Sequence, residues 1–264
     1  MKLSISNIGW SEENDAAVYS MMNNNGFKGL EIAPTRIFQD RPYSKLDDAR
    51  AWAKELKSEN GFVVSSMQSI WYGRSEKLFG TDDERATLED YTKRAIDFAE
   101  SIGCKNLVFG CPRNRSLPES ADEKVAIRFF KEIGEYAAEH WTVVGMEANP
   151  PIYNTNYIND TASALELIEK VGSKGFKLNL DVGTMVENGE DVSILKGREK
   201  LINHVHVSEP GLKPIEERQL HQELADLLKA CNYNGFVSIE VGKQDNIENL
   251  KRMMNYVKAV FGDN

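Results

Sequence analysis

The stretch VVGMEANPP, residues 143–151, decides how the rest of the chain is interpreted. Its apolar run, Val143 to Met146, has the composition of a β-strand buried on both faces, and the run stops at the carboxylate of Glu147. A carboxylate at the end of a buried strand is costly unless something holds it. The stretch therefore predicts a strand that delivers an acidic group to a site.

The same pattern recurs three times toward the C-terminus. GFKLNLD ends at Asp181, LINHVHV runs through His206, and GFVSIE ends at Glu240. Carboxylates and imidazoles bind divalent metals, and the C-terminal ends of parallel strands meet at one mouth of a barrel. The four stretches together predict a divalent metal site at such a mouth, formed by Glu147, Asp181, His206 and Glu240.

Strand-like and helical stretches alternate along the whole chain. Eight strand-helix units in 264 residues give about 33 residues each (264 divided by eight). This alternation implies right-handed crossovers and a parallel sheet, so we expect an α/β fold, a single-domain (β/α)8 TIM barrel over residues 1–264. The strands are expected to begin near Lys2, Lys28, Phe62, Lys105, Val143, Phe176, Leu201 and Phe236.

Local signals mark the ends of the predicted helices. Thr81 and Glu84 have the spacing of a capping box, and Ser120 with Glu123 is expected to open another helix. The long connections follow the C-terminal ends of the strands, which places the expected active site at that mouth. Glycines between a helix and the next strand are expected to be left-handed caps: Gly26, Gly61, Gly103, Gly175 and Gly235.

The charge balance limits the partners. Lys and Arg total 32 against 41 Asp and Glu, a net charge of -9, so neither nucleic acid nor an anionic membrane is expected as a partner. The start MKLSISNIGW lacks the apolar core of a signal peptide, and no apolar run approaches the roughly 18 residues of a membrane span. Three cysteines without CxxC spacing suit reduced thiols, so we expect a cytoplasmic protein.

Each proposed ligand, taken singly, has a simpler explanation. Glu240 could be an ion-pair partner or a helix cap, and Asp181 could cap the helix that follows it. As a set they would crowd three carboxylates in a dry cleft, which a cation must neutralise. The hard ligand set favours one Mn²⁺ or Mg²⁺ ion, with Co²⁺ or Zn²⁺ also open. His204 lies one layer deeper than His206 on the same strand face, where a hydrogen-bonded structural histidine is expected.

The ordered segments EANP, LDVGT, HVHVSEP and SIEVG resemble the xylose isomerase-like barrel superfamily. They are most similar to its sugar phosphate isomerase/epimerase branch, which includes ketose 3-epimerases, hydroxypyruvate isomerase, inosose dehydratase and relatives of endonuclease IV. The resemblance covers the whole barrel in strand order and is most specific from Glu147 to Glu240. It implies that the four predicted ligands bind the metal and that both glutamates exchange protons with the substrate carbon.

The chain departs from the epimerase pattern at two places. Thr184 stands where the epimerases carry a histidine, and the segment Glu209–Lys213 stands where they carry an arginine. The substrate contacts of the epimerases therefore do not carry over. The chain has only four histidines and none in the second or third predicted strand, so the three-metal pattern of endonuclease IV is missing and DNA repair is not expected.

Several residues near the predicted mouth are candidates for substrate binding. Glu31 and Gln68 could hydrogen-bond sugar hydroxyls, with surface or capping roles as the alternative. Trp71 could form an apolar wall under a sugar ring, or it could pack over the barrel end. His221 could contact the substrate, or it could be an ordinary residue at the start of the seventh helix.

Two arginines decide whether the expected substrate is charged. Arg113 and Arg115 could clamp a carboxylate or phosphate, with solvated arginines as the alternative.

We expect a metal-dependent isomerase or epimerase of a small sugar or sugar-derived hydroxy-carbonyl compound, with two opposed carboxylates exchanging a proton at an enediolate. A metal-dependent sugar or inosose dehydratase and a non-catalytic carbohydrate-binding barrel remain as alternatives. A homo-oligomer is also left open.

Overall fold

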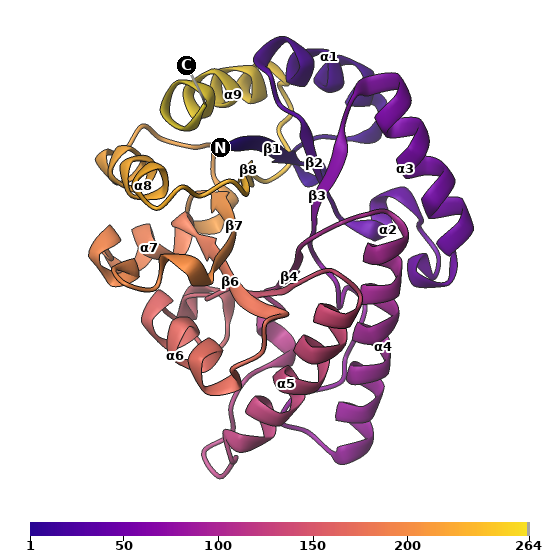
Figure 1. Cartoon of the computed structure of the whole chain (residues 1–264), viewed down its shortest axis with the longest axis vertical. Helices are drawn as coiled ribbons and strands as arrows, with labels where there is room; N and C mark the ends of the chain where they lie inside the picture. Colours follow the sequence, from indigo (N-terminus) through magenta and orange to yellow (C-terminus); the bar gives the residue numbers. More distant parts are fainter. Residues whose placement is uncertain (263–264) are drawn as a thin grey trace.

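The structure of the protein is a computed structural model, which describes residues 1–262. Eight parallel strands form a closed ring in sequence order, and β1 completes the ring against β8. Helices surround the ring on the outside (Figure 1). The predicted (β/α)8 TIM barrel is therefore confirmed. The strands are β1 (Lys2–Ser6), β2 (Gly29–Ile32), β3 (Val63–Met67), β4 (Leu107–Phe109), β5 (Val144–Met146), β6 (Phe176–Asp181), β7 (Ile202–Val207) and β8 (Phe236–Ile239).

The connections between strands carry the helices. None of the helices in residues 1–262 is both long and apolar enough to cross a membrane. The helices are α1 (Asp15–Asn25), α2 (Pro34–Ile37), α3 (Leu46–Asn60), α4 (Asp82–Ser101), α5 (Lys124–Glu139), α6 (Thr161–Val171), α7 (Val182–Asn188), α8 (Gln219–Ala230) and α9 (Glu248–Phe261).

Alternation along the strands separates an apolar outer face from a polar inner one. In β6, Leu178 and Leu180 belong to the hydrophobic core, whereas Asn179 and Asp181 are buried polar residues of the other face. Contacts between strands that are not neighbours in the ring show where this second face points, because they must cross the interior. Glu31 of β2, for example, contacts His204 and His206 of β7. The barrel is thus filled by polar side chains in place of the branched apolar layers usual in TIM barrels.

The junction between β3 and β4 is the shortest in the ring. Only Met67 and Leu107 are paired there, whereas every other junction pairs three or four residues. The backbone N–H of Met67 donates to the carbonyl of Asn106 at 2.9 Å. This short junction lies beside the loops that follow β3 and β4 at the mouth.

Two helix starts that looked alike in the sequence differ in the structure. The capping box of Thr81 and Glu84 at the start of α4 is confirmed. The capping pair predicted for Ser120 and Glu123 is wrong, since α5 begins at Lys124 without a side-chain cap from Glu123. Asp122 takes part instead, because its Oδ1 accepts from the backbone N–H of Lys124 at 3.0 Å.

The glycines expected as left-handed caps fall into two groups. Gly26 and Gly61 are left-handed caps of α1 and α3, and Gly103 has a positive φ just beyond α4. The prediction is wrong for Gly175 and Gly235, whose φ is not positive. A side chain at Gly175 would place its Cβ 2.1 Å from a backbone oxygen of α5, so this glycine allows a close approach of two backbones.

Candidate metal centre

Four side chains from consecutive strands converge at the C-terminal mouth of the barrel. Glu147 follows β5, Asp181 ends β6, His206 lies in β7 and Glu240 follows β8. Each offers one ligand atom, and these atoms all lie within 4.8 Å of one another. His206 Nδ1 is 3.0 Å from Glu147 Oε1 and 3.2 Å from Glu240 Oε2. The structure thus brings together the four residues predicted as metal ligands.

Glu31 fixes the ring of His206 from inside the barrel. Its Oε2 lies 2.9 Å from His206 Nε2 and 3.0 Å from His204 Nε2. Burial raises the pKa of Glu31, but the charges and hydrogen bonds of the two histidines outweigh this effect and leave the pKa lowered. An ionised carboxylate only accepts hydrogen bonds, so both Nε2 atoms donate. Nδ1 of His206 is then the nitrogen that faces the carboxylates.

His204 has the role expected of it. Its side chain is buried and hydrogen-bonded to Glu31. Burial lowers the pKa of His204, so its ring stays neutral.

The charges at the mouth need a cation. Burial is the main reason why the pKa values of Glu147, Asp181 and Glu240 are raised, and in each case a neighbouring carboxylate adds to the effect. Burial lowers the pKa of His206, but Glu31 and Glu240 outweigh it and hold the pKa well above its usual value. A proton on Nδ1 therefore supplies the positive charge that the carboxylates require.

The donor set fits a divalent cation in place of that proton. Three carboxylates and one imidazole nitrogen suit Mn²⁺ or Mg²⁺. A carboxylate on the far nitrogen of a ligating histidine is the usual partner in metal sites, and Glu31 provides it. The residues that could hold the ion are Glu147, Asp181, His206 and Glu240.

Asp181 also caps α7. Its Oδ2 accepts from the backbone N–H and the hydroxyl of Thr184 at 2.9 and 2.8 Å, and its Oδ1 accepts from Ser208. The capping alternative is therefore confirmed for this residue. It does not compete with ligation, because a carboxylate offers about four acceptor positions.

Three residues position Glu147. The buried Arg115 donates from Nη1 to the carbonyl oxygen of Glu147 and from Nη2 to Asn149 Oδ1, both at 2.9 Å. Asn149 Nδ2 donates to Glu147 Oε2 at 3.2 Å, and Asn179 Nδ2 donates to Oε1 at 2.8 Å. Both carboxylate oxygens of Glu147 are thus oriented by amides.

A pocket of about 180 Å³ lies over the four ligands. Three of them, Glu147, Asp181 and Glu240, are in its wall. Within the described chain, no lysine or arginine lines it. Its other polar lining side chains are Gln68, Ser69, Cys111, Asn149, Tyr153 and Ser208.

Of the six residues predicted as substrate contacts, Gln68 lines this pocket. Glu31 lies deeper, under the histidines, and is fully buried. Trp71 packs over the barrel end, with its ring edge-on to Phe109 and its Nε1 donating to Thr92 at 2.8 Å. This is the packing alternative for Trp71.

The other three candidates also lie away from the pocket lining. Arg113 is exposed, and Arg115 is buried behind Glu147. His221 is buried, with Nδ1 2.9 Å from the hydroxyl of Tyr256. Neither arginine meets the geometric condition for clamping an anion inside this pocket.

Sequence reasoning missed several residues of the site. Asn179 could have been found, because it stands two residues before Asp181 and strand alternation places both on one face. Asn149 and Tyr153 lie in the loop after Glu147, and Ser208 follows β7. No periodic pattern covers those loops, so their side-chain directions had no sequence signal.

The closed (β/α)8 barrel, with three carboxylates and one histidine clustered at its mouth, defines the class of protein as a TIM barrel with a candidate metal site. The chain matches the family model of the xylose isomerase-like TIM barrel over residues 21–260 and belongs to that family. The resemblance seen in the motifs from EANP to SIEVG is therefore confirmed.

Solved structures share this fold. A D-psicose 3-epimerase crystallised in the presence of D-fructose has a TM-score of 0.80 at 16% identity, with 100% of each chain covered. The 3-keto-D-glucoside 4-epimerase from E. coli has a TM-score of 0.78 at 20% identity, over 98% of this chain and 99% of that one. A probable 3-DHS dehydratase from Bacillus anthracis has a TM-score of 0.67 at 17% identity, over 98% and 99%. A comparison with curated proteins gives no match.

Proposed function

We propose that the protein is a divalent-metal-dependent isomerase or epimerase of a small, uncharged sugar or sugar-derived hydroxy-carbonyl compound. The observation that carries the proposal is the convergence of three carboxylates and His206 within 4.8 Å, under a pocket at the barrel mouth. The family membership and the epimerases among the structural neighbours support the same reaction class.

The pocket lining favours an uncharged substrate. An anionic phosphate or carboxylate would need cationic donors in a buried site, and the described residues that line this pocket include none. Three carboxylates also exceed the charge of one divalent cation. Hydroxyl groups suit the pocket better, because Gln68, Asn149 and Ser208 offer amides and a hydroxyl as partners.

Glu147 and Glu240 are the proposed proton carriers. They follow β5 and β8, with β6 and β7 between them in the ring, so they approach one carbon from different directions. One carboxylate would take the proton next to the carbonyl, and the other would return a proton to the opposite face. A bound divalent cation would supply Lewis-acid polarisation of the carbonyl oxygen. Both carboxylates are largely buried and reach the substrate only through the pocket that they line.

Proton exchange in deuterated water tests the proposal. Protein loaded with Mn²⁺ is incubated with a panel of uncharged ketoses, and the products are analysed by NMR and mass spectrometry. We expect a product of unchanged formula that carries deuterium next to the carbonyl. Glu240→Gln and Glu147→Gln should each slow the exchange by about 10²–10⁴-fold. Glu55→Gln, on the exposed face of α3, is the matched control and should exchange at the wild-type rate.

Three results would contradict the proposal in different ways. A product lighter by one water would indicate the dehydratase alternative. No exchange with any sugar, combined with sugar binding, would indicate a carbohydrate-binding barrel. Unchanged exchange in both glutamine variants would move the acid-base chemistry to other residues.

A further inference from the structure

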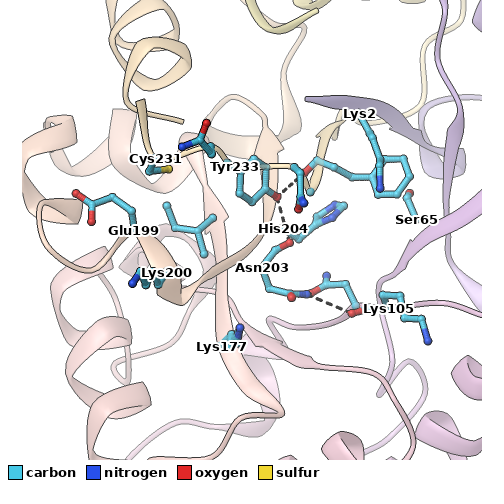
Figure 2. A pocket seen from close by; sticks show the side chains of 16 residues that line it. Lys2, Ser65, Lys105, Lys177, Glu199, Lys200, Asn203, His204, Cys231 and Tyr233 are labelled. Atoms are coloured by element: carbon cyan, nitrogen blue, oxygen red, sulfur yellow. Dashed lines mark hydrogen bonds between the residues drawn. The ribbon is translucent and has the colours of Figure 1, made fainter. Parts of the chain in front are cut away.

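A second cavity lies at the opposite end of the barrel from the metal centre. It has a volume of about 560 Å³ and is formed where the strands begin (Figure 2). Lys2 opens β1, Lys105 precedes β4 and Lys177 lies near the start of β6. None of the four predicted metal ligands lines this cavity.

The cavity concentrates positive charge in an acidic protein. Its lining contains four lysines and one carboxylate, that of Glu199, although the chain has a net charge of -9. Among residues 1–262, the side-chain ammonium groups of Lys177 and Lys200, which line the cavity, have no hydrogen bond or ion pair. Lys105 Nζ donates to a backbone carbonyl at 2.9 Å, and Lys2 Nζ lies 5.5 Å from the ring centre of Phe236. These cations come from separate elements and none has an acidic partner, so together they favour an anion.

A buried histidine adds a second and different group to the lining. His204 lines the cavity, although its side chain is only 1% exposed (Figure 2). Its Nε2 donates to Glu31, which leaves Nδ1 of the neutral ring as a hydrogen-bond acceptor. No described residue donates to this Nδ1. A ligand that places a hydroxyl here would satisfy it.

We propose that this cavity binds a small phosphorylated polyol, with its phosphate held by the lysines and a hydroxyl donating to His204 Nδ1. The site is separate from the proposed substrate pocket, which has no lysine or arginine in its lining. The binding therefore does not depend on the proposed reaction. A phosphorylated compound would bind at this end, since its charge does not suit the pocket at the other end.

Calorimetry with three probes tests the ligand class. Sorbitol 6-phosphate, sorbitol and inorganic phosphate are titrated into the purified full chain at low salt. None has a carbonyl group, so none imitates the proposed substrate. We expect sorbitol 6-phosphate to bind, inorganic phosphate to bind at least tenfold more weakly, and sorbitol to give no heat. The affinity should fall as salt is raised, because lysine-phosphate attraction is screened.

Paired lysine variants locate the site. The double variant Lys105→Gln/Lys177→Gln should bind sorbitol 6-phosphate at least tenfold more weakly than wild type. The control, Lys54→Gln/Lys258→Gln, changes the net charge equally at exposed positions of α3 and α9 and should stay within twofold. Circular dichroism verifies that both variants are folded. In protein with ¹⁵N-labelled histidine, the ring signals of His204 should shift on binding in the wild type.

Each other outcome overturns the assignment. Absence of binding by both phosphates would remove the anion site. Equal binding of sorbitol would show that charge is not recognised, and equal binding of inorganic phosphate would remove the hydroxyl contact. Equal weakening in both lysine pairs, or an unmoved His204 signal, would place the ligand elsewhere.

Discussion

Glu31 shows how one buried carboxylate can fix the orientation of a histidine that is a candidate metal ligand. It accepts hydrogen bonds from two histidines of β7, and only one of these histidines faces the mouth. By holding Nε2 of His206, it leaves Nδ1 directed at the carboxylates. Such an outer partner orients the ligand and raises its basicity.

Replacing Glu31 should weaken metal binding without removing a ligand. We expect Glu31→Gln to bind Mn²⁺ about 10–100-fold more weakly, because the ring of His206 loses its charged partner. Competition with a chromophoric chelator measures the affinity. Glu100→Gln is the control, since Glu100 also contacts a histidine, His140 at 2.8 Å, but on the surface. Wild-type affinity in Glu31→Gln would rule out this role.

Arg115 should matter for stability far more than its neighbour Arg113. Arg115→Met leaves the carbonyl of Glu147 and the Oδ1 of Asn149 without their buried donor. We expect the free energy of unfolding to fall by about 2–4 kcal/mol, measured by urea denaturation. Arg113→Met should change it by less than about 0.5 kcal/mol, because that side chain is exposed. Similar values for the two variants would contradict this account.

The sequence identified the four candidate ligands because each stands at or near the end of an apolar strand. It could not separate Arg113 from Arg115, which are two residues apart in one loop. Burial of Arg115 depends on Glu147 and Asn149, more than thirty positions away. The same holds for Glu31, whose partners lie in a strand across the barrel.

At the scale of helices and strands, the sequence pattern predicted where the elements lie, but it did not predict how they pack against one another. All eight strands begin within two residues of the predicted positions. The capping box of α4 was predictable because both of its partners lie within one turn. The role of Gly175 was not, because it depends on the distance between two backbones after the barrel has closed.

Adding one methyl group at Gly175 should disturb the packing of α5 on the turn before β6. Its Cβ would meet the carbonyl oxygen of Gly134 at 2.1 Å and the backbone nitrogen of Ala138 at 2.6 Å. We expect Gly175→Ala to lower the free energy of unfolding by about 1–3 kcal/mol in chemical denaturation. Lys174→Ala, at the exposed neighbouring position, should change it by less than about 0.5 kcal/mol. An equal effect at both positions would show that the approach can relax.

At the scale of the whole molecule, opposite charges are separated along the barrel axis. Carboxylates gather at the C-terminal mouth, and lysines gather around the cavity at the other end. The polar interior lies between them. The outward faces of the strands supply the apolar side chains of the core, whereas the inward faces carry serine, asparagine, glutamate and histidine. Composition counts both faces together, so it could not predict a polar interior.

Metal should stabilise the protein in a pH-dependent way. At 100 times its dissociation constant, Mn²⁺ should add about 2.7 kcal/mol at pH 7.5, or about 5–10 °C in Tm. The gain should shrink at pH 5.5, since protons compete for the carboxylates and for Nδ1 of His206. Differential scanning calorimetry with and without the ion measures both values. A variant lacking one ligand, Glu240→Gln, should lose most of the gain at either pH.

The expected increase of metal stabilisation with pH follows from the directions of the pKa shifts. His206 has a raised pKa in the folded state, so without metal its contribution to stability is present below about pH 6.5 and is lost as the pH rises through the folded pKa. The raised pKa values of Glu147, Asp181 and Glu240 act in the same direction above about pH 4. A bound divalent cation would neutralise the carboxylates and take the place of the proton on His206 Nδ1. The stabilisation by metal should therefore increase with pH. A gain that is larger at pH 5.5 would contradict this assignment.

The ring of strands has one short junction, between β3 and β4, and this has a kinetic consequence. Because only one pair of residues joins β3 and β4, we expect this junction to open locally more often than the other junctions of the barrel. Backbone amides of residues 63–67 and 107–109 should take up deuterium from solvent sooner than those of β6 and β7, as peptide mass spectrometry can follow. Gln68 and Gly110 lie just beyond this junction and line the pocket that also contains Glu147, Asp181 and Glu240. Local opening of this junction would therefore widen the pocket entrance on the β3–β4 side. Small molecules would then enter the pocket preferentially from that side.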